Sequence, residues 1–278
     1  MATPLAPEWT ESLDAETALA LLVWQREMGV DEAICDSPVN RYDTPRKLAE
    51  DLAASVAAPP TAAPAAAPAP LPEVAATDPV AEARRLAEAA GDLTALAEAM
   101  RGFEAMELRH GARNFVFADG NPAARVMIVG EAPGQEEDAR GLPFVGRAGQ
   151  LLDRMFHAIG LSRSSPDAQA ALYITNVLTW RPPGNRKPEA PEIAMMVPFL
   201  LRHIELAAPE VVVLMGNTPC QALLGQTGIL RLRGTWADVA GRPALAMTHP
   251  AYLLRNPAAK REAWADLLAL QARLRSLG

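Results

Sequence analysis

Four short stretches of the chain are apolar at nearly every position, and more polar segments separate them. Runs of this length that are apolar on both faces are typical of strands buried within a parallel sheet. We therefore predict four central strands. They cover residues 125–130, 172–178, 211–216 and 244–248.

Helical patterns alternate with these runs. Their apolar positions recur at spacings of three and four residues, which indicates amphipathic helices. The predicted helices cover about 147–160, 189–207, 217–225 and 258–276, with a further helical segment at 79–109. This alternation predicts an α/β fold, a three-layer α/β/α arrangement with a central, mainly parallel four-stranded sheet.

The N-terminal part of the chain has a different pattern. Residues 8–30 show a rough helical stripe, whereas residues 53–72 consist almost only of alanine and proline. The Ala/Pro composition favours an extended spacer and cannot form a core. We therefore divide the chain into an N-terminal helical arm (1–52), an Ala/Pro-rich linker (53–77) and a globular domain (78–278).

Charge and composition narrow the classes of protein. The chain has 278 residues and a net charge of -7, but residues 1–76 carry a balance of -8 and residues 77–278 a balance of +1. A nearly neutral domain argues against a nonspecific basic coat for nucleic acid, although local arginine clusters still bind phosphate. We find no secretory signal and no membrane span, and two cysteines cannot form a disulfide framework. We therefore expect a cytoplasmic protein that does not enter a membrane.

Polar side chains follow each predicted strand. Glu131 comes after the first strand, Asn176 lies at the end of the second, and His249 follows the fourth. Because the carboxyl ends of parallel strands meet at one edge of a sheet, we expect these three groups to converge. Taken singly, each has a structural interpretation, as a helix cap, a turn residue or an internal hydrogen-bonding group. The chain contains neither the GxGxxG pattern nor a Walker loop, so a nucleotide site of those kinds is not expected.

The segments around these residues are specific as a set. In chain order they read GEAPGQEED (130–138), GLPFVGRAGQLLD (141–153), YITNVLTWRPPGNRKP (173–188) and HPAYLLRNP (249–257). With these motifs the chain resembles the uracil-DNA glycosylase superfamily, closest to family 4, over roughly residues 103–276. The resemblance implies hydrolysis of the N-glycosidic bond of uracil in DNA. The base is flipped out of the stack and an abasic site remains for base excision repair.

The resemblance implies three catalytic residues. Glu131 matches the carboxylate of the loop that holds the catalytic water and the sugar side of the site. His249 matches the imidazole beside the uracil carbonyl, where a donated hydrogen bond stabilises the negative charge that develops. Asn176 matches the amide that reads the base edge, because its one donor and one acceptor fit O4 and N3–H of uracil, whereas cytosine presents the opposite pattern.

Further positions of the uracil site follow from the same resemblance. Phe144 matches the aromatic residue that stacks on uracil, and Glu137 matches an acidic position that guards against the methyl group of thymine. The complete set of implied uracil-binding residues is Gly130, Gln135, Glu137, Phe144, Asn176 and His249.

Two segments are predicted to contact the DNA backbone or duplex. Arg181 and Arg186 lie in a Pro/Gly-rich loop at the expected edge of the sheet, where arginine commonly binds phosphate. Leu253, Leu254 and Arg255 are expected to form a loop that wedges the duplex open while phosphates are held.

The chain departs from family 4 at the cluster-binding positions. Members of that family typically carry four cysteines that bind an iron–sulfur cluster, and thiolates are the ligands that such clusters require. Aligned by the motifs, the corresponding positions are Phe103, Met106, Trp180 and Met196. We therefore expect no iron–sulfur cluster, no other metal and no cofactor, with apolar packing in place of the cluster.

Given this resemblance and its departures, three functions remain open. The first is an active, cluster-free glycosylase that acts as a monomer on uracil-containing DNA. The second is a non-catalytic uracil-DNA-binding protein, but the short segment 176–186 lacks the basic, histidine-containing insertion of the known binder. The third is an adaptor, in which the arm binds a protein partner.

Overall fold

A computed structural model of the chain describes residues 78–277 together with Thr17 and Leu19. The predictions of an N-terminal arm at 1–52 and a linker at 53–77 lie outside the described residues, apart from those two positions. The first helix after residue 77 is α3 (Pro79–Ala89), and the predicted domain boundary at residue 78 stays a prediction.

The sheet has six strands among the described residues, in the order β1-β3-β2-β4-β6-β5. The four inner strands are parallel and confirm the predicted ones: β2 (Val126–Gly130), β3 (Leu172–Asn176), β4 (Val211–Met215) and β6 (Arg242–Met247). The prediction of four strands was wrong in number. The edge strands β1 (Ala118–Gly120) and β5 (Trp236–Val239) pair antiparallel with β3 and β6.

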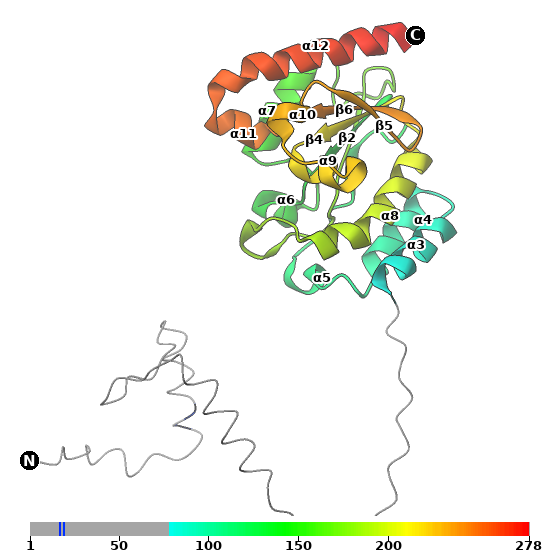
Figure 1. Cartoon of the computed structure of the whole chain (residues 1–278). Helices are drawn as coiled ribbons and strands as arrows, with labels where there is room; N and C mark the ends of the chain where they lie inside the picture. Colours follow the sequence, from blue (N-terminus) through cyan, green and yellow to red (C-terminus); the bar gives the residue numbers. More distant parts are fainter. Residues whose placement is uncertain (1–16, 18, 20–77, 278) are drawn as a thin grey trace, which may run out of the picture. The chain divides into compact units, whose positions relative to one another are not determined.

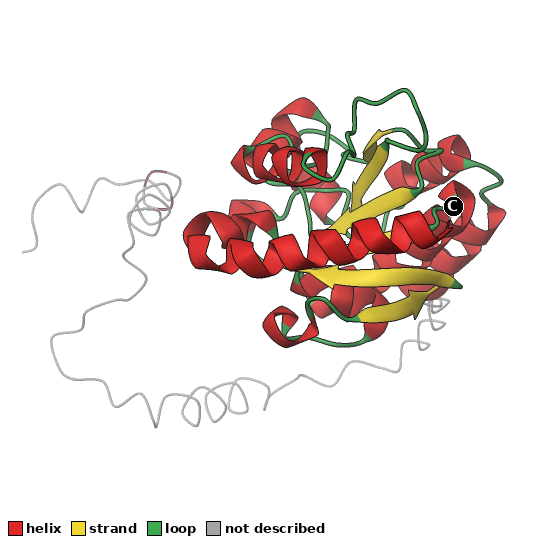
Figure 2. Ribbon diagram, turned by 90° about the horizontal axis from the view of Figure 1, so that it is seen from above, coloured by secondary structure: helices red, strands yellow, loops and turns green. Residues whose placement is uncertain are grey.

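The helices form two layers, one on each face of the sheet. Figure 1 shows α3, α4 and α8 below the sheet and α7 and α12 above it, and Figure 2 shows α12 running across the strands. The predicted three-layer α/β/α arrangement is therefore confirmed. The bounds are α4 (Leu93–Gly102), α5 (Leu108–Gly111), α6 (Gln135–Arg140), α7 (Arg147–His157), α8 (Ala190–Ala207), α9 (Asn217–Leu224), α10 (Ile229–Leu232), α11 (Pro250–Arg255) and α12 (Lys260–Leu277), with short 3-10 turns η2 (Pro183–Asn185) and η3 (Pro257–Ala259).

Successive side chains of each inner strand point to opposite faces of the sheet, so each strand contributes to two separate hydrophobic cores. In β2, Met127 and Val129 face the core between the sheet and helices α3, α4 and α8. Val126 and Ile128 face the core between the sheet and helices α7 and α12. All five residues of β2, β3 and β4 are buried. Strands covered on both faces are apolar throughout, which is why the inner strands were visible in the sequence.

The predicted helical segment 79–109 consists of three helices. Asp78 caps α3 and Asp92 caps α4, each by accepting a hydrogen bond from a backbone N–H of the first turn. Such caps favour a new helix start at Asp92 over a continuous helix. Within the described residues, no helix is long and apolar enough to cross a membrane.

Candidate uracil site

The carboxyl ends of the inner strands gather the predicted catalytic groups. Gly130 at the end of β2 pairs with Asn176 at the end of β3, and Glu131 follows directly. Beyond β6, His249 precedes α11. β2 lies between β3 and β4 in the sheet. The chain passes from β2 to its neighbour β3 and then to β4, the neighbour on the opposite side of β2. The strand order therefore reverses at β2, and this topological switch point lies beside Glu131. We call this edge, with Glu131, Asn176, Thr218 and His249, the rim.

Gly130 leaves room for two side chains of the site. A Cβ atom placed on Gly130 would lie 2.3 Å from Oδ1 of Asn176 and 2.4 Å from Cε2 of Phe144. Both distances are far below van der Waals contact, so any larger residue would displace the amide or the ring. The ring of Phe144, from the loop after α6, and the amide of Asn176 therefore meet over the end of β2.

Phe144 also contacts the histidine of the rim. Its ring lies 5.4 Å from the imidazole of His249, centroid to centroid, at an interplanar angle of 29°. Phe144 is 6% exposed as a residue, and its backbone has a φ of +53°, in the left-handed region. A non-glycine residue in that region is strained and persists only where its surroundings hold it.

His249 is held in one orientation. Its Nδ1 accepts a hydrogen bond from the backbone N–H of Ala251 at 3.1 Å, which caps α11. In the neutral ring the proton then resides on Nε2. Burial, and after it the charge of Arg255, lower the pKa of His249 to about 4, against the opposing charge of Glu137. At neutral pH, His249 is therefore a neutral imidazole whose Nε2–H is a hydrogen-bond donor.

The carboxylate of Glu131 is fixed by a residue that sequence reasoning missed. Thr218, in the first turn of α9, donates a hydrogen bond from Oγ1 to Oε2 of Glu131 at 2.5 Å. Thr218 is 7% exposed, whereas Glu131 is half-buried. Thr218 comes just after the third predicted strand, and a residue at that position also reaches the rim, so the sequence did carry a signal for it. One oxygen of Glu131 is thus occupied by Thr218, and this contact sets the orientation of the other.

Glu137 connects two loops of the site. Its Oε1 accepts hydrogen bonds from the N–H groups of Val145 and Gly146, at 3.0 and 2.9 Å, and its Oε2 accepts one from Gly134 at 3.1 Å. The loop after β2 is therefore fastened to the loop that carries Phe144. Exclusion of the thymine methyl group by Glu137 stays a prediction. Gln135 is exposed at the start of α6.

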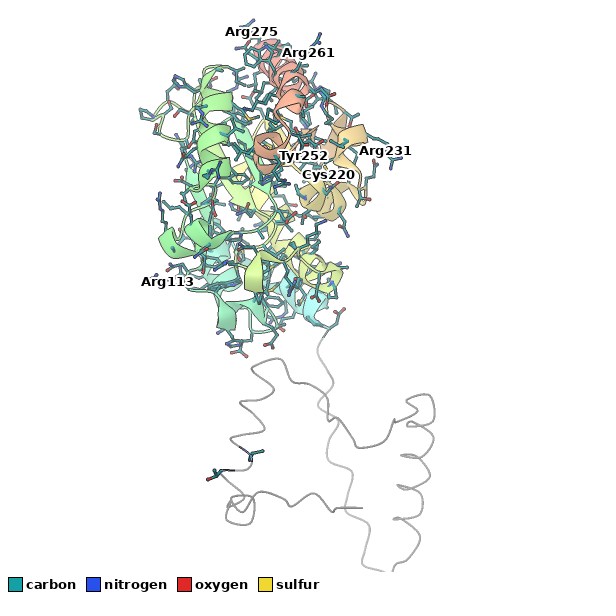
Figure 3. The ribbon with its side chains drawn as sticks, turned by 90° about the vertical axis from the view of Figure 1, so that its left-hand side faces the viewer. Arg113, Cys220, Arg231, Tyr252, Arg261 and Arg275 are labelled. Carbon is teal, nitrogen blue, oxygen red and sulfur yellow. The ribbon has the colours of Figure 1, made fainter. Side chains whose placement is uncertain are left out.

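The predicted phosphate contacts, Arg181 and Arg186, both have protein partners. Nε of Arg181 donates to Oδ1 of Asn185 at 2.7 Å. Arg186 forms an ion pair with both carboxylate oxygens of Glu192. The side chains are 25% and 37% exposed, so both remain accessible from solvent. Figure 3 shows the exposed Arg113 and Arg231 on opposite sides of the domain, with the exposed Arg261 and Arg275 at its top, so the four do not gather on one face.

The predicted wedge loop is a helix in the structure. Leu253, Leu254 and Arg255 all belong to α11, which starts because His249 caps it and Pro250 occupies its first position. Leu253 is fully buried and packs in a small core with Leu151 and Ala263, so it stabilises the fold and is not accessible to DNA in this structure. Leu254 is half-buried and Arg255 is exposed, and DNA contact remains a prediction for these two.

The four positions expected to replace cluster ligands lie in one hydrophobic core. Phe103, Met106 and Met196 are at most 2% exposed, and Trp180 packs against the same core. The ring of Phe103 meets the ring of Phe199 edge-on, with 5.4 Å between the ring centroids. The ring centroids of Trp180 and Phe115 lie 5.0 Å apart. These residues do not fit an iron–sulfur cluster, because none of them can supply a thiolate.

A thiolate from elsewhere in the described residues does not change this conclusion. Burial raises the pKa of the Cys220 thiol to about 11, so this side chain is neutral at physiological pH. Among residues 78–277, Thr17 and Leu19, no three histidine, cysteine or acidic side chains group as a metal site.

Comparison with known proteins gives a consistent result. A family model described as the uracil DNA glycosylase superfamily matches residues 117–268. The type-4 uracil-DNA glycosylase of Thermotoga maritima is 38% identical over 164 residues, which are 58% of this chain and 82% of the relative. That of Archaeoglobus fulgidus is 39% identical over 162 residues, or 55% and 78% of the two chains. That of Pyrobaculum aerophilum is 35% identical over 187 residues, or 63% and 91%.

Proposed function

Because the chain belongs to the uracil-DNA glycosylase superfamily, we propose that it hydrolyses the N-glycosidic bond of uracil in DNA and leaves an abasic site. The observation that carries this proposal is the meeting of Asn176 and Phe144 at Gly130, beside a neutral His249. This set offers an amide for the base edge, an aromatic face for stacking and a donor for the leaving group.

Recognition of uracil falls to two of these residues. Asn176 is 3% exposed as a residue, so the donor and the acceptor of its side chain are costly to leave unpaired. Uracil satisfies both groups through O4 and N3–H, whereas cytosine offers the opposite pattern and leaves them unpaired. The ring of Phe144 supplies a stacking face for any flipped base, so selectivity rests on Asn176 rather than on Phe144.

His249 is proposed to stabilise the departing base. As the glycosidic bond breaks, the bonding electrons move to uracil and negative charge grows on its carbonyl oxygen. The Nε2–H of His249 donates a hydrogen bond to that oxygen, and the neutral ring requires no prior protonation. The sugar becomes an oxocarbenium-like cation, which a water molecule attacks.

Glu131 is proposed to act on the sugar side. With Oε2 held by Thr218, Oε1 is available to orient the attacking water or to stabilise the cationic sugar electrostatically. We further propose that the enzyme works without an iron–sulfur cluster, because the four corresponding positions form part of an apolar core. A cytoplasmic location, action as a monomer and a protein partner for the N-terminal arm belong to the same proposal.

The test is uracil release from an oligonucleotide with a single deoxyuridine, read by cleavage at the abasic site. We expect release by the wild type and losses of about 10²–10³-fold in His249→Ala and Asn176→Ala. His157→Ala, at an exposed position on α7, is the matched control and should retain full activity. Tight binding to the uracil oligonucleotide without release would favour the non-catalytic binding protein instead.

A further inference from the structure

Arg163, in the segment between α7 and β3, makes polar contacts with four residues through one guanidinium group. Its Nη1 and Nη2 donate to the backbone carbonyls of Pro143 and Phe144, each at 2.9 Å. Nε donates to Asp153 at 2.8 Å, and Nη1 also contacts Asp119 at 2.9 Å. The fork geometry of arginine suits this simultaneous contact, which a single ammonium group cannot reproduce.

The two carbonyls belong to the strained part of the uracil site. Phe144 has a φ of +53°, and its ring lies against the imidazole of His249. A Cβ on Gly149 would lie 1.7 Å from the carbonyl oxygen of Phe144, so α7 approaches this backbone as closely as glycine allows. The loop therefore has its shape imposed by neighbours, since the left-handed conformation is unfavourable for phenylalanine.

Glu137 holds the same loop from its other side. It accepts the N–H groups of Val145 and Gly146, which follow Phe144, while Arg163 binds the carbonyls of Pro143 and Phe144. The peptide groups on both sides of Phe144 are thus fixed by charged side chains of opposite sign. Hydrogen bonds to charged groups are stronger than neutral ones, so the pair can offset the backbone strain.

The surroundings of Arg163 show that it is a fixed part of the structure. Its side chain is 15% exposed, and its ion-pair partners come from two other elements, Asp119 from β1 and Asp153 from α7. A largely buried arginine with two carboxylates is neutralised and immobilised rather than free to contact DNA phosphates. Two further N–H groups of its guanidinium donate to the backbone carbonyls of Pro143 and Phe144.

We propose that Arg163 is a positioning residue for uracil stacking, which acts only by holding the backbone of Phe144. This inference rests on the proposed function of the site. Without Arg163 the Phe144 loop relaxes toward an unstrained conformation, and the ring leaves the place where a flipped base would stack. Binding of the extrahelical uracil then weakens, while the groups that act on the glycosidic bond remain in place.

The experiment is a double-mutant cycle between Arg163→Met and Phe144→Ala in the full-length protein. Binding is measured with an oligonucleotide that contains 2′-fluoro-deoxyuridine, whose fluorine suppresses cleavage, and uracil release is measured separately under single-turnover conditions. We expect Arg163→Met to raise Kd about tenfold in the wild-type background, within the range found for base stacking. It should change Kd less than about twofold when residue 144 is already alanine, because the two effects then share one cause.

Two further variants keep the test interpretable. Arg163→Lys retains the charge opposite Asp119 and Asp153 but cannot serve both carbonyls, so it should bind with an intermediate Kd. Arg125→Met is the matched control: Arg125 is 13% exposed, pairs with Glu210 and donates to the carbonyl of Leu274, away from the site. It should lower the thermal stability without changing the Kd of the folded protein.

The outcomes separate the inference from the proposed function. An equal loss in both backgrounds of residue 144, or an unchanged Kd in folded Arg163→Met or Arg163→Lys, would overturn the positioning role. A wild type that binds the fluorinated oligonucleotide but releases no uracil from the natural one would contradict the proposed catalysis. In that case the cycle on binding would still decide the role of Arg163.

Discussion

The rim and the apolar core around Phe103 are held together by different forces. At the rim, single hydrogen bonds fix the groups that matter: Thr218 to Glu131, and Ala251 to His249. The side chains of Phe103, Met106, Trp180 and Met196 make apolar and ring contacts instead, and the buried Nε1 of Trp180 has no hydrogen-bond partner among the described residues. The difference teaches that the geometry of the rim depends on single polar atoms, whereas the stability of the core around Phe103 depends on the volume of its side chains.

The largest expected effect is on stability, from truncation in the apolar core. Phe103→Ala removes a ring that is 1% exposed and packs on Phe199, so it should lower the free energy of unfolding by about 3–5 kcal/mol. Urea denaturation measures this change. Below the unfolding transition kcat should change little, and a selective loss of kcat in the folded variant would break the comparison.

The next effect is on catalysis, from a change that preserves volume at the rim. Thr218→Val removes the hydroxyl group that donates to Glu131 and should cost about 1.5–3 kcal/mol of transition-state stabilisation, the range for hydrogen bonds to charged groups. Single-turnover rates measure it. Thr218→Ser keeps the hydroxyl and should recover most of the rate. If Thr218→Val has no effect in wild type, or the same effect in a Glu131→Gln background, the contact does not act through Glu131.

A smaller effect concerns pH. Burial lowers the pKa of both His249 and His203, to about 4 and about 3, so the folded state binds fewer protons than the unfolded state below pH 6.5. Their contribution to stability is fully present above that pH and is lost as the pH falls through the folded pKa values, about 4 for His249 and about 3 for His203. Ring-nitrogen NMR should show His249 still neutral at pH 5. Protonation of His249 near pH 6.5 would contradict the neutral donor proposed for catalysis.

The sequence predicted the inner sheet and the convergence at the rim because both follow from apolar strands and their shared direction. It did not predict the edge strands β1 and β5. β1 has only three residues, all half-buried, and β5 is partly exposed, so neither strand is a continuous apolar run. The helical turn that buries Leu253 was also missed, although Pro250 after a capping residue was a signal for it.

The supporting contacts of the site were harder to predict than its principal residues. Glu131 and His249 follow strands and Asn176 ends one, so topology alone brings all three to the carboxyl ends of the strands. Arg163 meets Pro143, Asp119 and Asp153, which lie 20, 44 and 10 residues away in the chain, and no local pattern pairs them. Contacts of this kind are set by tertiary packing and become visible only in the fold.

The most direct test of the central claim combines uracil release with metal analysis of the same wild-type sample, purified without exposure to air. We predict full uracil release by a colourless protein with far less than one iron atom per chain, unchanged after treatment with a chelator. A brown protein that contains iron, and whose uracil release falls when the iron is removed, would contradict the proposal that the enzyme works without a cluster.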